Sequence, residues 1–197
     1  MTLDSFIKKY NHPEVIVLLL GKRDVLKGDK DKLVLLAKKL TELTKHITFR
    51  SGNASGSDEL FKLGVSSIDV NRIELVTPYK GHRKKSSSGY NTISLDAVDI
   101  VKEKEIIYHS KQNNKYKGIV ERYEQGFKDK IGMKGAYILR DTLMVVGAKG
   151  LNVPKSSFAI FYDDLSKPMS GGTGHTMTVC NSLEIPFIDQ SVWFNWL

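Results

Sequence analysis

Apolar runs and amphipathic stretches alternate along the first part of the chain. An almost unbroken apolar run at 14–20 is typical of a strand that is buried on both faces of a parallel sheet. Leucines and an alanine recur at helical spacing across 33–43, which predicts an amphipathic helix. Shorter apolar runs predict strands at 46–50 and 72–78, with a short helix at 58–63 between them. This order of strands and helices predicts an α/β fold with a mostly parallel sheet.

The last part of the chain follows the same order. A helix is expected at 136–146, a strand at 158–162, a second helix at 175–183 and a short strand at 185–188. The aromatic tail at 192–197 is expected to cap the hydrophobic core, with an oligomer contact as the alternative.

The middle of the chain has a different pattern. A basic stretch rich in serine and glycine at 79–92 predicts a mobile loop. Two further stretches, 94–108 and 114–130, have a helical pattern and are joined by a short turn. Glycines at 132–135 then predict a break before the next helix.

The size and composition are those of an ordinary globular protein. The chain has 197 residues, of which 41% are hydrophobic and 26% charged. These values fit one domain over 1–197 that carries a helical insertion at about 80–133. The single cysteine, Cys180, excludes an internal disulfide framework and favours a reducing compartment. Because no signal peptide opens the chain and no apolar run could span a membrane, we expect a cytoplasmic protein with no membrane partner.

Three polar, glycine-containing segments follow predicted strands: Gly21 to Asp24, Ser51 to Asp58, and Ser170 to His175. In a parallel sheet these segments meet at one edge, where ligands of open α/β sheets bind. The last segment also precedes a helix, whose unpaired N–H groups and partial positive charge suit a phosphate or carboxylate. We therefore predict an anion or nucleotide site, with plain connecting turns as the alternative. Neither the dinucleotide fingerprint nor a P-loop is present.

Four short motifs in this order resemble a known family. They are Gly-x-Arg, Ser-Gly-x-Ala-x-Gly-x-Asp, Arg-x-x-x-Met and Gly-Gly-Thr-Gly, which begin at Gly21, Ser51, Arg140 and Gly171. Together they resemble the SLOG superfamily, which includes the LONELY GUY phosphoribohydrolases, the DNA-processing protein DprA and many small bacterial and phage proteins. The resemblance covers the predicted sheet units and implies a Rossmann-like three-layer fold.

The resemblance also implies a nucleotide-like ligand held by these motifs. The candidate ligand-binding residues are Gly21, Arg23, Ser51, Gly52, Asn53, Ala54, Asp58, Arg140, Met144, Gly171, Gly172, Thr173, Gly174, His175 and Thr176. Arg140 would meet a phosphate or ribose, and its alternative is an exposed helix charge. Asp58 would line the floor of the pocket, and its alternative is a helix cap.

One departure from the family bears on catalysis. The phosphoribohydrolases read Pro-Gly-Gly-x-Gly-Thr-x-x-Glu, whereas this chain has Ser170, His175 and Thr178 at the Pro, Thr and Glu positions. Cleavage of a glycosidic bond needs a carboxylate near the sugar, which Thr178 cannot supply.

Other residues could take the catalytic role. Asp58, Asp163 and Asp164 are candidate carboxylates. His175 is a candidate acid or base because its reference pKa lies near neutrality, with packing beside the loop as the alternative. No cofactor is implied, and no cluster of His, Cys and carboxylate residues has the spacing of a metal site.

Three hypotheses for function follow. The first, which we favour, is binding of a nucleotide or nucleotide-derived small molecule. The second is hydrolysis of the N-glycosidic bond of a nucleoside monophosphate. The third is binding of single-stranded nucleic acid, which the net charge of +8 and the basic run Lys80 to Lys85 favour. A homodimer is left open.

Overall fold

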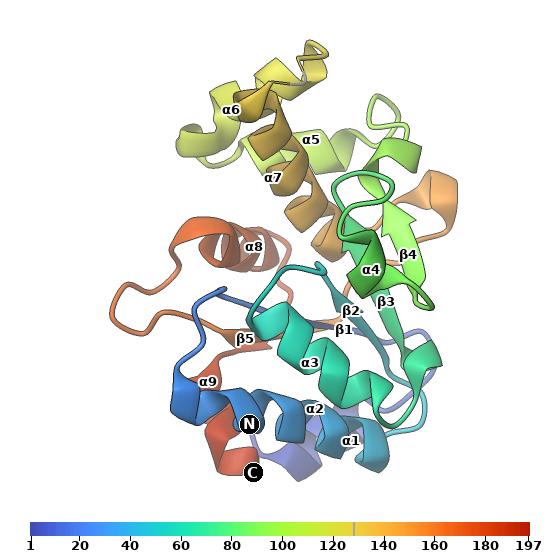
Figure 1. The fold of residues 1–197 in the computed structure, drawn as a ribbon, viewed down its shortest axis with the longest axis vertical. Helices are drawn as coiled ribbons and strands as arrows, with labels where there is room; N and C mark the ends of the chain where they lie inside the picture. The colour runs from blue at the N-terminus through green and yellow to red at the C-terminus, as the bar shows by residue number, and fades with distance from the viewer. Residues whose placement is uncertain (128) are drawn as a thin grey trace.

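A computed structural model describes residues 1–127 and 129–197. A six-stranded sheet in the order β4-β3-β2-β1-β5-β6, with every pair parallel, lies between two layers of helices (Figure 1). The strands are β1 (Ile16–Gly21), β2 (Thr48–Ser51), β3 (Ile73–Thr77), β4 (Asn91–Ser94), β5 (Phe158–Tyr162) and β6 (Phe187–Ile188). This arrangement confirms the predicted α/β, Rossmann-like three-layer fold.

The helices fall into two layers. Those against one face are α1 (Leu3–Tyr10), α2 (Lys30–Leu43), α3 (Ser57–Ser66) and α9 (Gln190–Trp193). Those against the other face are α5 (Lys104–Lys111), α6 (Asn114–Glu124), α7 (Lys130–Val146) and α8 (Gly171–Ser182). The short helix α4 (Lys84–Ser87) lies beside the end of β3 (Figure 1). Short 3-10 turns are η1 (Lys27–Asp29), η2 (Val70–Arg72), η3 (Leu95–Ala97), η4 (Lys149–Leu151) and η5 (Phe194–Trp196).

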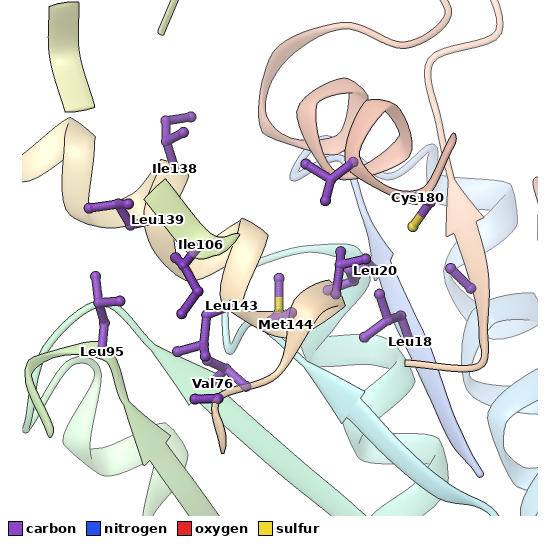
Figure 2. Packing of buried hydrophobic residues seen from close by; sticks show 14 of the residues in the cluster. Leu18, Leu20, Val76, Leu95, Ile106, Ile138, Leu139, Leu143, Met144 and Cys180 are labelled. Atoms are coloured by element: carbon purple, nitrogen blue, oxygen red, sulfur yellow. The ribbon is translucent and has the colours of Figure 1, made fainter. Parts of the chain in front are cut away.

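The apolar run of β1 supplies both halves of the core. Val17 and Leu19 pack into the cluster beneath α1, α2 and α3, whereas Leu18 and Leu20 pack into the cluster beneath α7 and α8. Figure 2 shows Leu18 and Leu20 on the side of the sheet that faces Met144 of α7. Because all four β1 side chains are almost fully buried, each contributes about 1.5–3 kcal/mol to folding. This burial explains why the run is continuous rather than alternating.

The path of the chain creates a switch point beside β1. The chain passes from β1 outward through β2, β3 and β4, and then returns through α5, α6 and α7 to place β5 on the other side of β1. Ligands of open α/β sheets bind outside the carboxyl ends of the strands at such a switch point.

The predicted loop at 79–92 is partly wrong. Its last residues begin the edge strand β4, which pairs with β3, and α4 precedes that strand. Lys62 on α3 holds α4 in place, because its Nζ donates to the Ser86 carbonyl oxygen at 2.7 Å and to Ser86 Oγ at 2.6 Å. The stretch therefore contains a short helix and the start of the edge strand.

Three helical predictions also change. The predicted helix at 94–108 contains η3 and the start of α5, and the helix predicted at 114–130 ends at Glu124 in α6. Residue 128, within that second prediction, lies outside the described residues. The predicted break at 132–135 is wrong, because α7 runs through both glycines.

The aromatic tail packs on the core, as predicted. Trp193 is fully buried and its Nε1 donates to the Phe161 carbonyl oxygen at 2.8 Å. Trp196 Nε1 donates to the Met1 carbonyl oxygen at 3.2 Å, which joins the two ends of the chain. No helix in the described ranges combines the length and the apolar character needed to cross a membrane.

Candidate functional site

A cavity of about 670 Å³ opens at the carboxyl edge of the sheet, where β1 and β5 end. Its walls come from the segment after β1, the β2–α3 segment, helices α6 and α7, the segment after β5 and the first turns of α8. The lining residues are Leu20, Gly21, Lys22, Arg23, Asp24, Ala54, Asp58, Tyr116, Ile119, Lys134, Tyr137, Ile138, Arg140, Asp141, Met144, Asp163, Asp164, Ser170, Gly171, Gly172, Thr173 and Thr176. The three predicted glycine-containing segments therefore meet at one cavity.

Asp58 holds two of these segments together. Its carboxylate accepts hydrogen bonds from the N–H of Gly21 at 3.3 Å and of Ala54 at 3.2 Å. Burial raises the pKa of Asp58, which the nearby Arg140 and these N–H donors partly offset. The residue at the N-cap of α3 is Gly56, and no side chain caps that helix. Asp58 thus fixes the backbone of the cavity floor rather than capping a helix.

Arg140 reaches the cavity from α7. Its Nη1 donates to the Gly52 carbonyl oxygen at 2.7 Å, and only 5% of the residue is exposed. A Cβ atom at Gly52 would lie 1.6 Å from this nitrogen, so the contact requires glycine there. Arg140 is therefore a buried cation of the cavity wall and not an exposed helix charge.

Asp141, the next residue on α7, is a cavity residue that the sequence analysis missed. Its Oδ1 lies 3.1 Å from Arg140 Nε, and a Cβ atom on Gly172 would lie 3.1 Å from its Oδ2. Burial raises the pKa of Asp141 to about 6; Arg140 opposes this shift and the charge of Asp58 adds to it. The sequence feature that could have identified Asp141 is the charged pair Arg140–Asp141 inside an otherwise apolar stretch of helix.

The sequence predicted a loop at the Gly-Gly-Thr-Gly motif, with the helix beginning after it. In the structure the motif instead forms the first turn of α8. Ser170 occupies the N-cap without a side-chain hydrogen bond to the helix. The first N–H groups of an α-helix have no partner within the helix. Gly171, Gly172 and Thr173 therefore bring unpaired N–H groups to the cavity wall. Gly174 instead packs beneath the turn, where a Cβ atom would lie 1.9 Å from the Met169 carbonyl oxygen.

Ionisable side chains of both signs surround the cavity. The cations are Lys22, Arg23, Lys134 and Arg140, and the carboxylates are Asp24, Asp58, Asp141, Asp163 and Asp164. Besides Asp58, two of these carboxylates have partners: Asp163 Oδ2 accepts from the Met169 N–H at 2.9 Å, and Asp164 lies 3.7 Å from Lys22 Nζ. A hydrogen bond from Ser166 also lowers the pKa of Asp164. An anionic ligand must therefore approach the cations while avoiding several acids.

Two tyrosines from the middle of the chain complete the walls. Tyr116 on α6 donates through its hydroxyl to the Gly171 carbonyl oxygen at 3.1 Å. Tyr137 on α7 lies against His82, with the ring centroids 5.6 Å apart. Neither residue is marked as a site residue by the sequence, because single tyrosines within amphipathic helices are typical of core packing.

Most of the predicted ligand-binding residues meet at this cavity. Those in its lining are Gly21, Arg23, Ala54, Asp58, Arg140, Met144, Gly171, Gly172, Thr173 and Thr176. Those outside the lining are Ser51, Gly52, Asn53, Gly174 and His175. Of the four catalytic candidates, Asp58, Asp163 and Asp164 line the cavity and His175 does not.

His175 lies behind the cavity wall. It is 2% exposed, its Nε2 lies 2.9 Å from Thr142 Oγ1, and its ring centroid is 5.2 Å from that of Tyr116. Burial lowers the pKa of His175 to about 4, so the ring is neutral near neutral pH. This placement matches the packing alternative, in which His175 helps to dock α8 on α7 and α6.

Asn53 also faces away from the cavity. Its Oδ1 accepts from Ser86 Oγ at 3.2 Å, and its carbonyl oxygen accepts from Arg83 Nη1 at 3.0 Å. Asn53 thus anchors α4 and the basic segment before it. The described part of the chain contains no group of three or more His, Cys, Asp or Glu side chains that could hold a metal ion.

No known protein-family model matches the chain, and neither does any curated protein. A solved structure is similar in fold: DNA processing protein A from Helicobacter pylori, described as having a unique single-stranded DNA binding mode. The match has a TM-score of 0.51 and 16% sequence identity, and it covers 92% of this chain and 67% of that protein chain. At this level of identity, the similarity shows a shared fold.

Proposed function

We propose that the cavity binds a nucleotide or a nucleotide-derived molecule, with its phosphate against the first turn of α8. The observation that carries this proposal is the meeting of unpaired N–H groups from Gly171, Gly172 and Thr173 with the cations Lys22 and Arg23 in one cavity. Helix amino ends bind phosphate because their N–H groups and partial charge both favour an anion.

The size of the cavity fits such a ligand. Small-molecule sites are typically clefts of about 300–1,000 Å³ with apolar walls and a few placed polar groups. The volume of about 670 Å³ lies within this range. Ile119, Ile138 and Tyr137 provide an apolar wall on which a base can pack.

Titration calorimetry tests the proposal. The wild-type protein is titrated with nucleoside monophosphates and with ADP-ribose, and we expect binding that weakens when the phosphate is removed. Arg23→Gln removes a cation of the lining and should weaken nucleotide binding about tenfold, as expected for loss of a charged hydrogen bond. Lys8→Gln, at an exposed position on α1, is the matched control and should leave binding unchanged.

The same samples distinguish binding from hydrolysis. Chromatography of the titrated mixtures shows whether free base is released from the monophosphates. The absence of binding by folded protein across the whole panel would contradict the proposed function.

Single-stranded nucleic acid is the second candidate ligand. The DNA processing protein of similar fold is described as binding single-stranded DNA, and a basic segment borders the cavity here. Its His82 packs on Tyr137 of the lining, and Lys84 and Lys85 beside it are exposed. In this mode of binding, one nucleotide of the strand enters the cavity, and the phosphates of neighbouring nucleotides contact the lysines.

Gel-shift experiments with a labelled oligodeoxynucleotide test this second candidate. Phosphate contacts release counterions, so binding should fall steeply as salt is raised. Absent binding, or binding that does not change with salt, would exclude this role for the basic segment.

A further inference from the structure

Arg140 and Asp141 form an ion pair in which both partners keep unused hydrogen-bonding capacity. Arg140 Nε lies 3.1 Å from Asp141 Oδ1 but outside hydrogen-bond geometry. The Arg140 guanidinium donates to protein through Nη1, and the described residues offer no acceptor to Nη2. The Asp141 carboxylate likewise accepts no hydrogen bond from the described residues, although the residue is only 8% exposed. Of these atoms, Arg140 Nε is buried without a hydrogen-bond partner, and buried polar groups are normally satisfied. The remaining capacity of the pair is open to the cavity that both residues line, so a ligand group is a natural partner.

The neighbouring carboxylate shows the contrast. Asp58 is buried beside the same arginine, but its two oxygens accept from the N–H groups of Gly21 and Ala54. Asp58 is thus satisfied by the protein, whereas Asp141 shares the cavity wall without a donor. The unsatisfied acceptor and the partly unsatisfied donor are consecutive residues on α7.

The chemistry of the pair favours a hydroxyl group over a phosphate. A phosphate at this position would meet the Asp141 carboxylate at close range and would be repelled by it. A hydroxyl both accepts and donates, so it can accept from the Arg140 guanidinium while donating to Asp141. Nucleotides carry such hydroxyls at the 2′ and 3′ positions of ribose, and carboxylates bind ribose hydroxyls in other α/β proteins.

We propose that Arg140 and Asp141 together bind a hydroxyl of the ribose 2′,3′-diol, so that the cavity selects ribonucleotides over deoxynucleotides. This inference rests on the proposed function and makes Asp141 a residue that determines specificity. The phosphate then binds the N–H groups of α8, while the ribose hydroxyl contacts Asp141, which lies beside Gly172 of that turn.

The test compares AMP with 2′-deoxy-AMP and 3′-deoxy-AMP by titration calorimetry at pH 7.5, a chosen condition well above the raised pKa of Asp141. Hydrogen bonds to charged groups contribute about 1.5–3 kcal/mol, so one of the two deoxy analogues should bind about 10- to 100-fold more weakly than AMP. In Asp141→Asn and Asp141→Ala, the ratio of affinities should fall at least about threefold, because the charged hydrogen bond to Asp141 is weakened or lost while the one from Arg140 remains.

Asp31→Asn, an exposed carboxylate of α2 outside the cavity lining, is the control and should keep the wild-type ratio. Circular dichroism of each variant establishes that it is folded before it is titrated. Binding of AMP and both analogues with equal affinity by the wild-type protein would overturn the inference and leave the proposed function intact. Undiminished selectivity in both folded Asp141 variants would also overturn it. Failure of all three nucleotides to bind would overturn the proposed function and the inference together.

Discussion

The Gly52 carbonyl oxygen accepts a hydrogen bond of 2.7 Å from Arg140 Nη1, which joins the end of β2 to α7 across the cavity floor. The two residues are far apart in the sequence, and each limits what the other position tolerates. A side chain at Gly52 would occupy the place of the Arg140 guanidinium. The position of Arg140 in the cavity therefore depends on the absence of a Cβ atom on a different element.

Gly52→Ala should displace Arg140 and weaken nucleotide binding. The added Cβ atom would lie 1.6 Å from Nη1, so either the guanidinium or the β2–α3 segment must move. Misfitted groups in a packed site typically cost about 1–3 kcal/mol of stability. Titration calorimetry and thermal unfolding measure the two effects.

Gly118→Ala is the matched control for this substitution. Gly118 lies in α6 with no atom near the position of an added Cβ, and alanine in a helix interior is more stable than glycine by about 0.5–1 kcal/mol. Gly118→Ala should therefore raise the melting temperature slightly and leave binding unchanged. Wild-type binding by Gly52→Ala would contradict the role of the contact.

The Asp141 carboxylate should destabilise the folded protein at neutral pH. Its pKa is raised from 3.8 to about 6, which corresponds to a penalty on the order of 3 kcal/mol for the ionised form. Since the folded state holds the proton more tightly, the penalty is absent below pH 4 and grows until about pH 6. Asp141→Asn should thus raise the free energy of unfolding above about pH 6, and the gain should disappear near pH 4. Urea unfolding at several pH values measures it.

His175 should have the opposite dependence on pH. Burial lowers its pKa from 6.5 to about 4, so protonation of the folded state costs on the order of 3 kcal/mol. Stability that depends on the neutral ring is complete above about pH 6.5 and is lost as the pH falls toward 4. In the wild-type protein, protonation of Asp141 stabilises the folded state over the same pH range and masks this loss of stability. The loss should therefore be visible in Asp141→Asn, which cannot titrate at this position. His175→Gln should remove the loss, and nucleotide binding by the folded variant should persist because His175 lies outside the cavity.

The sequence was most informative where burial dictates the pattern. The continuous apolar run of β1 predicted a strand buried on both faces, and Leu18 and Val17 do pack into opposite cores. The edge strand β4 was missed because it has the sequence Asn-Thr-Ile-Ser and is half exposed, so no apolar run marks it. Its position is set by pairing with β3, which is a tertiary effect.

The helical glycines of α7 misled the analysis for a physical reason. Gly135 was read as a break, but a Cβ atom there would lie 2.7 Å from the Ile119 carbonyl oxygen of α6. Glycine at this position allows the two helices to pack closely, and tertiary packing offsets its poor helix propensity. Asp141 was missed for a related reason, because an acid in a helix usually lies in solvent, whereas the tertiary packing of α7 buries this one.

Arg50 and Glu74 should be among the most sensitive positions for folding. Arg50 is fully buried; its Nε donates to Glu74 Oε1, and its Nη1 donates to the Met144 carbonyl oxygen at 2.8 Å and the Pro154 carbonyl oxygen at 2.9 Å. Arg50→Met leaves a buried carboxylate unpaired and should cost about 3–5 kcal/mol. Arg50→Met/Glu74→Leu removes both charges and should recover part of this loss, as chemical denaturation would measure. A double variant no more stable than Arg50→Met would show that the lost hydrogen bonds to the carbonyl oxygens, and not the unpaired carboxylate, account for the loss.

Lys84 and Lys85 separate the two candidate ligands. Both lysines are exposed on α4, outside the cavity lining, so they can contact the phosphates of a strand but not a mononucleotide in the cavity. Lys84→Gln/Lys85→Gln should weaken binding of an oligodeoxynucleotide and reduce the slope of log affinity against log salt by about 1–2. AMP binding should be unchanged. An unaltered salt slope would exclude the basic segment as the path of the strand, whereas parallel loss of AMP binding would show that α4 also supports the cavity through Asn53.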